Sequence, residues 1–169
     1  FSYKINSELD MRFDLSQKHK ANDLLNIKSK KDIADIIFKY SEERRSRAIA
    51  GSILKMRPIK NVYELVEAIR RSTPPKNRNK TLARVFQAIR ILVNSELSIL
   101  ESFLSGFFHH LSVGGRIVFI SFHSLEDRIV KRALKDLSVK KKIKILTKKP
   151  LYPSQEENNS NRRSRSAKL

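Results

Sequence analysis

The side chains best suited to chemistry lie in one short stretch, "FHSLEDR", at residues 122–128. It follows six almost uninterruptedly apolar residues, Arg116 to Ser121, which are typical of a buried strand. His123, Ser124 and Asp127 have groups that hydrogen-bond a substrate, move a proton or position a ligand. In an open α/β sheet, ligands bind outside the carboxyl ends of the strands, so this order of residues predicts a binding pocket.

Structural roles compete with this interpretation. Ser124 and Asp127 have the spacing of a capping box, in which two side chains satisfy the first amides of a helix. Burial with a hydrogen-bond partner is the commoner role of a histidine such as His123. A Ser-His-Asp hydrolase is disfavoured because the turn lacks the glycines of a nucleophile elbow and adjacent side chains point apart.

His109 and His110 are adjacent on a predicted helix and cannot converge on one ion. They are therefore expected at the surface of that helix, and no metal site is predicted.

The elements that position this stretch follow the order of an α/β fold. Gly114 and Gly115 are predicted to turn the chain into the apolar strand, which is expected to be covered by helices on both faces. A second strand is predicted at 143–147, and the order helix, turn, strand, helix indicates an α/β protein. The helix predicted after residue 124 is expected to bury Ile129, Val130, Leu134 and Leu137.

A helical lobe is predicted upstream, from residue 23 to about residue 73. Ser29 and Asn61 each begin a capping box, and apolar side chains follow each of them at helical spacing. Ser41 is predicted to begin another helix between these two.

The apolar period continues over residues 82–111, which is longer than a normal globular helix. Asn94 and Ser95 interrupt it with two polar residues. The sequence therefore predicts two helices or one bent helix, with the break at these residues.

Composition limits the class of protein. The chain has 169 residues, 40% of them hydrophobic, which is enough for one core of ordinary size. No apolar run is long enough to cross a bilayer, and the absence of cysteine excludes disulfides and thiolate metal ligands. Lys and Arg number 36 against 17 Asp and Glu, and the formal net charge of +19 favours a polyanionic partner such as nucleic acid. A proteome rich in lysine would produce the same charge without such a partner.

The basic residues that could grip RNA phosphates flank the second predicted strand and lie near the C-terminus. An alternative is that they form an ordinary solvated face. The phosphate-contact candidates are Lys140, Lys141, Lys142, Lys148, Lys149, Arg162, Arg163 and Arg165.

Four separated segments carry a resemblance to a known family: "ELDMRFD" (8–14), "RVFQAIRILVNSEL" (84–97), "GGRIVFISFHSLEDRIVKR" (114–132) and "RSRSAKL" (163–169). In order and spacing they resemble the bacterial small-subunit ribosomal RNA cytosine-N4 methyltransferases, and the resemblance covers essentially the whole chain. The chain departs from the family pattern at Phe13, where a second Met is usual, and in the residues just before Leu9. Both departures lie beside matched positions and concern the details of the pocket.

The resemblance implies an α/β fold with a class I (Rossmann-like) methyltransferase core, of which this chain holds the later strands only, and an inserted α-helical domain. Residues 1–22 would end the N-terminal half of the core and residues 23–80 would form the inserted helical domain. Residues 81–153 would form the C-terminal half of the core, and residues 154–169 a basic polar tail that leads into a final strand.

The resemblance also implies S-adenosylmethionine as the methyl donor and the exocyclic N4 amine of a cytosine in small-subunit (16S) ribosomal RNA as the acceptor. The partner would be this RNA or the ribosomal particle, in the cytoplasm and away from membranes. No catalytic base is assigned by the resemblance. The candidates for the substrate pocket are Asp10, Arg12, Ser121, His123, Ser124, Asp127 and Arg128.

The chain has four glycines, at 51, 106, 114 and 115, and they do not form the glycine-rich turn with which class I methyltransferases bind their cofactor. The family carries that turn and its ribose-binding acid before the segment at which this sequence begins. We therefore expect no cofactor-binding residue in this chain, and an incomplete enzyme that alone neither binds S-adenosylmethionine nor methylates RNA. Two alternatives are a non-catalytic basic RNA-binding or ribosome-associated module and a different nucleotide-binding α/β enzyme.

Overall fold

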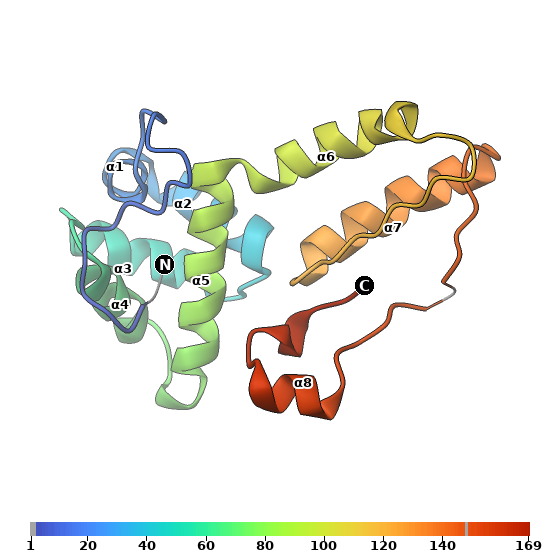
Figure 1. Ribbon diagram of the computed structural model, residues 1–169. Helices are drawn as coiled ribbons and strands as arrows, with labels where there is room; N and C mark the ends of the chain where they lie inside the picture. Colours follow the sequence, from blue (N-terminus) through green and yellow to red (C-terminus); the bar gives the residue numbers. More distant parts are fainter. Residues whose placement is uncertain (1–2, 148) are drawn as a thin grey trace. The chain divides into compact units, whose positions relative to one another are not determined.

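A computed structural model describes residues 3–147 and 149–169 (Figure 1). The chain divides into two compact units, Phe1–Glu96 and Leu97–Leu169. Each unit has its own internal packing.

The two units are built mainly from helices. The first contains α1 (Ala21–Ile27), α2 (Lys30–Ser41), α3 (Ser46–Lys55), α4 (Val62–Arg71), the 3₁₀ turn η1 (Pro75–Asn77) and α5 (Arg78–Asn94). After the division come most of α6 (Glu96–Gly106), then η2 (Phe107–His110), α7 (Ser124–Val139), α8 (Gln155–Ser160) and η3 (Ser164–Ser166).

Two of the predicted helix starts are confirmed. Ser29 Oγ accepts a hydrogen bond from the Asp32 amide at 3.1 Å, and Asn61 Oδ1 accepts one from the Glu64 amide at 3.0 Å. Each of these acids bonds back to the amide of its cap residue, so both capping boxes are complete.

The helix start predicted at Ser41 is wrong. Ser41 belongs to the last turn of α2, and its hydroxyl donates to the Ile37 carbonyl at 2.5 Å. Glu42 then ends α2 in the left-handed conformation, at φ 53°, and α3 begins only at Ser46. The serine hydroxyl is satisfied by the preceding turn of its own helix, a local alternative to capping the next one.

The core of the first unit lies between α2, α3, α4 and α5, with α2 against α3 and α5, and α4 against α3 and α5 (Figure 1). The side chains of this core come from the apolar stripes that helical spacing predicts. Each fully buried Ile or Leu contributes about 1.5–3 kcal/mol to the free energy of folding relative to an exposed one. The most buried large side chains of this core include Leu9, Ile33, Ile37, Ile49, Ile53, Leu65, Ile69, Leu82, Val85 and Ile89.

Helix α5 belongs to this core, so the compact unit extends to Glu96. The break predicted at Asn94 and Ser95 is confirmed. Helix α5 ends at Asn94, Ser95 is left-handed at φ 50°, and α6 starts at Glu96. Within the described residues no single helix is long and apolar enough to span a membrane; the bent pair Pro75–Asn94 and Glu96–His110 passes that test by length and composition only.

The predicted strands at 116–121 and 143–147 do not form: over residues 3–147 and 149–169 the structure has no β-strand and only two isolated bridges, Glu8–Asn61 and Ser121–Lys168. The turn at Gly114 does form, with φ 80°. The expected cover on both faces is also wrong, because Val118 and Ile120 are 66% and 60% exposed. A strand exists only through pairing with a neighbour, and a six-residue apolar pattern cannot specify that neighbour.

The second unit has an aromatic cluster of Phe103, Phe107 and Phe119. The rings of Phe103 and Phe107 stack with centroids 5.9 Å apart, and Phe119 meets Phe107 edge-on at 5.6 Å. The prediction that α7 buries its apolar stripe is wrong, because no α7 residue is fully buried. The four stripe residues, Ile129, Val130, Leu134 and Leu137, are only half-buried.

The C-terminal segment returns to the rest of the second unit. Lys168 exchanges two backbone hydrogen bonds with Ser121, at 2.9 and 2.8 Å, and Leu169 exchanges two with Leu151. The polar stretch before it contains α8, capped by Ser154, whose hydroxyl accepts from the Glu157 amide. The contact between Ser121 and Lys168 is an isolated β-bridge.

Candidate functional site

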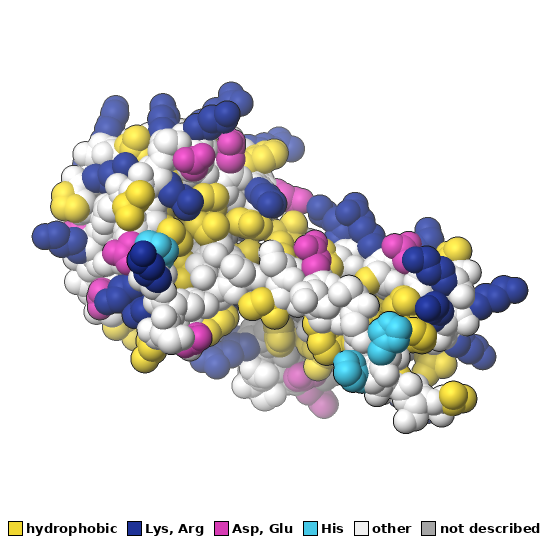
Figure 2. All heavy atoms as spheres, turned by 90° about the horizontal axis from the view of Figure 1, so that it is seen from above, with side chains coloured by type: hydrophobic (Ala, Val, Ile, Leu, Met, Phe, Trp, Pro, Cys, Tyr) yellow, Lys and Arg dark blue, Asp and Glu magenta, His cyan; other side chains and the backbone are white. Residues whose placement is uncertain are grey.

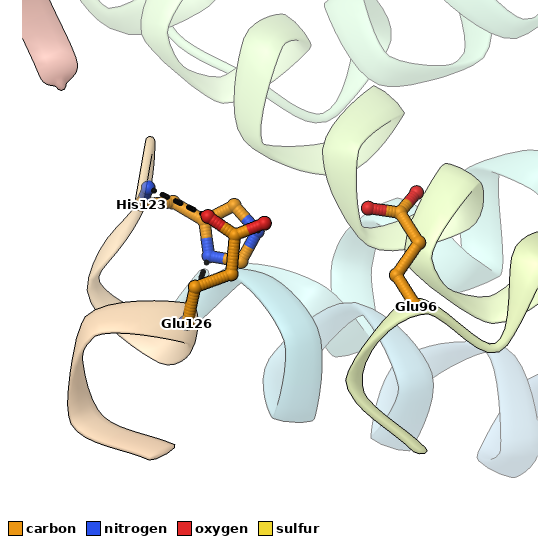
Figure 3. Close-up of side chains that lie close together, drawn as sticks. All are labelled: Glu96, His123 and Glu126. Atoms are coloured by element: carbon orange, nitrogen blue, oxygen red, sulfur yellow. Dashed lines mark hydrogen bonds and ion pairs between the residues drawn. The ribbon is translucent and has the colours of Figure 1, made fainter. Parts of the chain in front are cut away.

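His123 is the N-cap of α7, one residue before the cap predicted at Ser124. Its ring Nδ1 accepts from the Glu126 amide at 3.3 Å, and the Glu126 carboxylate accepts from the His123 and Phe122 amides at 3.3 and 2.9 Å (Figure 3). The capping-box prediction for Ser124 and Asp127 is therefore wrong. An unprotonated imidazole nitrogen accepts as a serine hydroxyl does, and the extended backbone of His123 places it at the cap.

The cap selects one tautomer of the neutral His123 ring. Since Nδ1 accepts a hydrogen bond, it carries no proton, and the neutral ring has its proton on Nε2. Nε2 is buried 3.2 Å from Glu126 Oε1, and within the described residues no other group lies near enough to accept a hydrogen bond from it. The Nε2 side of the His123 ring thus faces the Glu126 carboxylate.

Glu126 remains negatively charged at the start of α7. Burial favours its neutral form, but the adjacent His123 imidazole and the Phe122 amide outweigh this and lower its pKa. A carboxylate also complements the positive end of the helix. Sequence reasoning missed Glu126, although its position three residues after His123 is the spacing of a capping box.

Asp127 binds two lysines. Its Oδ2 is 3.0 Å from Lys131 Nζ and 3.3 Å from Lys168 Nζ, and its side chain is 15% exposed. Burial again favours the neutral form, but the two ammonium groups outweigh it and lower the pKa of Asp127. Lys168 also pairs with Ser121 through the backbone, so it links two predicted site residues. In the sequence, only the motif segment 163–169 pointed to a role for Lys168.

Ser124 and Arg128 lie in the first two turns of α7 and are exposed. The structure therefore gathers Ser121, His123 and Asp127 around the start of α7, with the other two at its surface. Asp10 and Arg12 belong to the first unit.

Asp10 and Arg12 form a bidentate ion pair in the loop before α1. Arg12 Nε and Nη2 lie 2.7 and 2.9 Å from the two carboxylate oxygens, and Arg12 Nη1 also donates to the carbonyls of Leu15 and Gln17. The hydrogen bonds from Arg12 hold the pKa of Asp10 below its ordinary value. Arg12 thus clamps the loop, in which Met11 has a φ of +66°.

Asn94 supports this loop from the end of α5 and is 3% exposed. Its Nδ2 donates to the Met11 carbonyl at 2.8 Å and to the Arg90 carbonyl at 2.9 Å, and its Oδ1 accepts from the Phe13 amide at 2.7 Å. The sequence indicated only a helix break at this position. A polar residue after a long apolar period was the available signal for a buried amide.

The predicted phosphate-contact side chains are exposed at every position that the structure describes. Lys148 lies outside the described residues. Lys142 Nζ lies 4.7 Å from the centre of the Phe108 ring, a cation–π contact. Lys and Arg side chains outnumber acidic ones over the face drawn in Figure 2. His109 and His110 are exposed, as predicted. The exposed candidates are Lys140, Lys141, Lys142, Lys149, Arg162, Arg163 and Arg165.

The chain that holds the His123–Glu126 cap, the Asp10–Arg12 ion pair and the exposed lysines and arginines matches one known family along its entire length. The sequence profile of the MraW methylase family matches residues 1–169. The chain belongs to this family.

Curated relatives agree with this assignment. The chain is 49% identical over 173 residues to a protein named ribosomal RNA small subunit methyltransferase H from Thermosipho africanus, covering 100% of the chain and 58% of the relative. Proteins of the same name from Rippkaea orientalis and Kosmotoga olearia are 48% and 49% identical, with 100% of the chain and 56% and 58% of the relatives covered. The chain thus spans a little more than half the length of these relatives.

Proposed function

We propose that this chain is part of an enzyme that transfers a methyl group from S-adenosylmethionine to the N4 amine of a cytosine in 16S ribosomal RNA. The observation that carries the proposal is the family match over residues 1–169, together with relatives named for small-subunit RNA methylation. The helical part of the first unit would be the domain inserted in the methyltransferase core, and the segment 116–121 would belong to that core.

The reaction requires positioning above all. The exocyclic amine is a poor nucleophile because its lone pair is delocalised into the ring. S-adenosylmethionine would supply the methyl group, and the side chains of the enzyme would hold the amine in line with it. Holding the base in near-attack geometry supplies much of the rate, and RNA offers such a base most readily from an unpaired or extruded position.

The cluster at the start of α7 suits a cytosine. The cytosine edge beside the amine has the acceptors N3 and O2, so we propose that the His123 Nε2–H, which is buried beside Glu126 before the base binds, turns to donate to this edge. Ser121 and Ser124 would add hydrogen-bonding walls, and Asp127 and Arg128 would act as positioning residues. In the first unit, Asp10 and Arg12 would shape the loop that approaches the substrate.

The methyl donor would bind mainly through other parts of the enzyme. Class I methyltransferases hold the cofactor on a glycine-rich turn, and the isolated glycines Gly51 and Gly106 lie inside helices. Gly114 and Gly115 form the turn before residue 116. Isothermal titration of the 169-residue chain with S-adenosylmethionine is therefore expected to show no saturable binding at micromolar concentrations.

Two substitutions at His123 test the role of its donor in the whole enzyme. His123→Asn keeps a good N-cap acceptor but loses the Nε2–H, whereas His123→Ala loses both. We expect both to lower methylation tenfold or more, with Asp10→Ala having a similar effect. Only His123→Ala should lose the cap, at about 1 kcal/mol of stability.

The assay is mass spectrometry of nucleosides from small-subunit RNA and particles incubated with enzyme and cofactor. Ser154→Ala, which removes the cap of α8, is the matched control and should retain wild-type turnover. Wild-type turnover in His123→Asn would show that the ring only caps α7.

A non-catalytic RNA-binding module is the second candidate, favoured by the excess of 19 positive charges. Photocrosslinking of the whole protein with labelled S-adenosylmethionine separates the two functions, because a binding module would not be labelled above background.

A further inference from the structure

The first unit has a cavity of about 470 Å³ on the outer face of α3. Four cationic side chains line it: Lys30 from the start of α2, Arg47 and Lys55 from α3, and Arg71 from the end of α4. None of the residues proposed above for the substrate pocket belongs to it.

The spacing on α3 creates this face. Arg47, Gly51 and Lys55 recur every four residues and so lie along one side of the helix, while Ile49 and Ile53 are fully buried on the other. Gly51 leaves room in the middle. A Cβ at this position would lie 3.3 Å from Lys30 Cε and 3.6 Å from its Nζ, so the lysine extends across the glycine.

The cavity has a strong positive charge, and few carboxylates lie near enough to neutralise it. Arg71 pairs with Glu67 at 3.0 Å, where both side chains are largely exposed. For Lys30, Arg47 and Lys55 there is no carboxylate at ion-pair distance in the described part of the chain, and all three are exposed. No Asp or Glu lines the cavity.

We propose that this cavity binds backbone phosphates of RNA. The proposal rests on the RNA-methylating function above and adds a second contact, on the helical unit. The remaining lining residues, among them Ser52 and Ser72, include no aromatic ring on which a base could stack and no Asn or Gln to read a base edge. The cavity therefore positions RNA without selecting its sequence.

The salt dependence of RNA binding by the whole enzyme tests the proposal. The variant Lys30→Gln/Arg47→Gln/Lys55→Gln removes three cations that would each bind a phosphate. Each bound phosphate contributes about 0.7 to the slope of log affinity against log salt concentration for single-stranded RNA, so the slope should fall by about 2. The decrease should be the same for a small-subunit RNA oligonucleotide and for a scrambled RNA of equal length.

A matched control removes the same charge from the same unit. Lys31, Lys76 and Lys80 are exposed and do not line the cavity, and their triple Gln variant should retain most of the wild-type slope. An equal decrease of slope in both triple variants would overturn the proposal, because only total charge would then matter. Weaker binding to poly-glutamate without weaker binding to RNA would assign the cavity to an acidic protein and also overturn it.

A single substitution gives an independent result if the triple variant folds poorly. Gly51→Glu puts a carboxylate among the three cations and replaces a helical glycine with a better helix former, so the urea midpoint should not fall. The salt slope of RNA binding should nevertheless decrease, whereas Asn79→Glu, on the exposed side of α5, should leave it unchanged. An unchanged slope in a folded Gly51→Glu protein would refute the phosphate site.

A methylation assay distinguishes failure of the phosphate-site proposal from failure of the proposed function. Wild-type enzyme that methylates RNA while Gly51→Glu keeps the full slope would refute the cavity and support the function. Wild-type enzyme that never methylates RNA, while the Gly51→Glu slope falls, would support the cavity and refute the function.

Discussion

Replacing Asn94 with alanine is expected to destabilise the first unit by about 2–3 kcal/mol. The buried Asn94 amide makes three hydrogen bonds, to Met11, Phe13 and Arg90, and each is worth about 1 kcal/mol net. The better helix propensity of alanine offsets about 0.5 kcal/mol of the loss. Met11 has a positive φ, so the substitution also removes a hydrogen bond that maintains an unfavourable backbone conformation.

Urea unfolding, followed by circular dichroism of the helices at neutral pH, measures the effect. With a slope of about 2 kcal/mol per molar urea, the midpoint should fall by about 1–1.5 M. Asn79→Ala is the matched control in the same helix, since its side chain is exposed, and it should change stability by no more than about 0.5 kcal/mol.

Asn94→Asp sharpens the test because it keeps the size of the side chain and the acceptor for the Phe13 amide. It replaces the two donated hydrogen bonds with a carboxylate that faces the Met11 and Arg90 carbonyls. Its midpoint should therefore fall at least as far as that of Asn94→Ala. Wild-type midpoints in both variants would refute the assignment of Asn94 as the support of the loop.

Three further predictions concern a helix cap, a carboxylate and the basic surface. Asn61→Ala should cost about 1 kcal/mol of stability, because the α4 amide that it caps loses its acceptor; urea unfolding checks this, and an unchanged midpoint would contradict it. Since Arg12 holds the pKa of Asp10 below its ordinary 3.8, the carboxylate adds stability that is complete above that pH and is lost as the pH falls through the lowered pKa. The melting temperature of the wild type should thus exceed that of Asp10→Asn at about pH 6 and approach it at about pH 2, whereas a constant difference would count against the ion pair. Neutralising the three lysines at 140–142 should reduce the salt slope of RNA binding by about 0.7 for each phosphate that these side chains bind, and an unchanged slope would leave them as a solvated face.

The sequence by itself determined the features that depend on neighbours three or four residues away. The capping boxes at Ser29 and Asn61, the apolar stripes of α2 and α4, and the break at Asn94 all form as predicted. A cap and a helical face are local, because the side chain and the backbone groups that it contacts are fixed by one turn of helix. The four motif segments were likewise sufficient for a resemblance to the family that the sequence profile confirms.

Only the tertiary structure decided the features that depend on distant partners or on close local alternatives. The segment 116–121 has the composition of a strand, yet its one ladder partner within the described chain is Lys168. The competition between His123 and Ser124 for the cap was decided by backbone dihedrals, which composition does not encode. The pairing of Asp127 with Lys168, 41 residues away, and the burial of Asn94 against the loop at Met11, 83 residues away, arise from packing of the whole chain. Residue spacing alone cannot predict such contacts, because closing loops of this length costs entropy that only the assembled core repays.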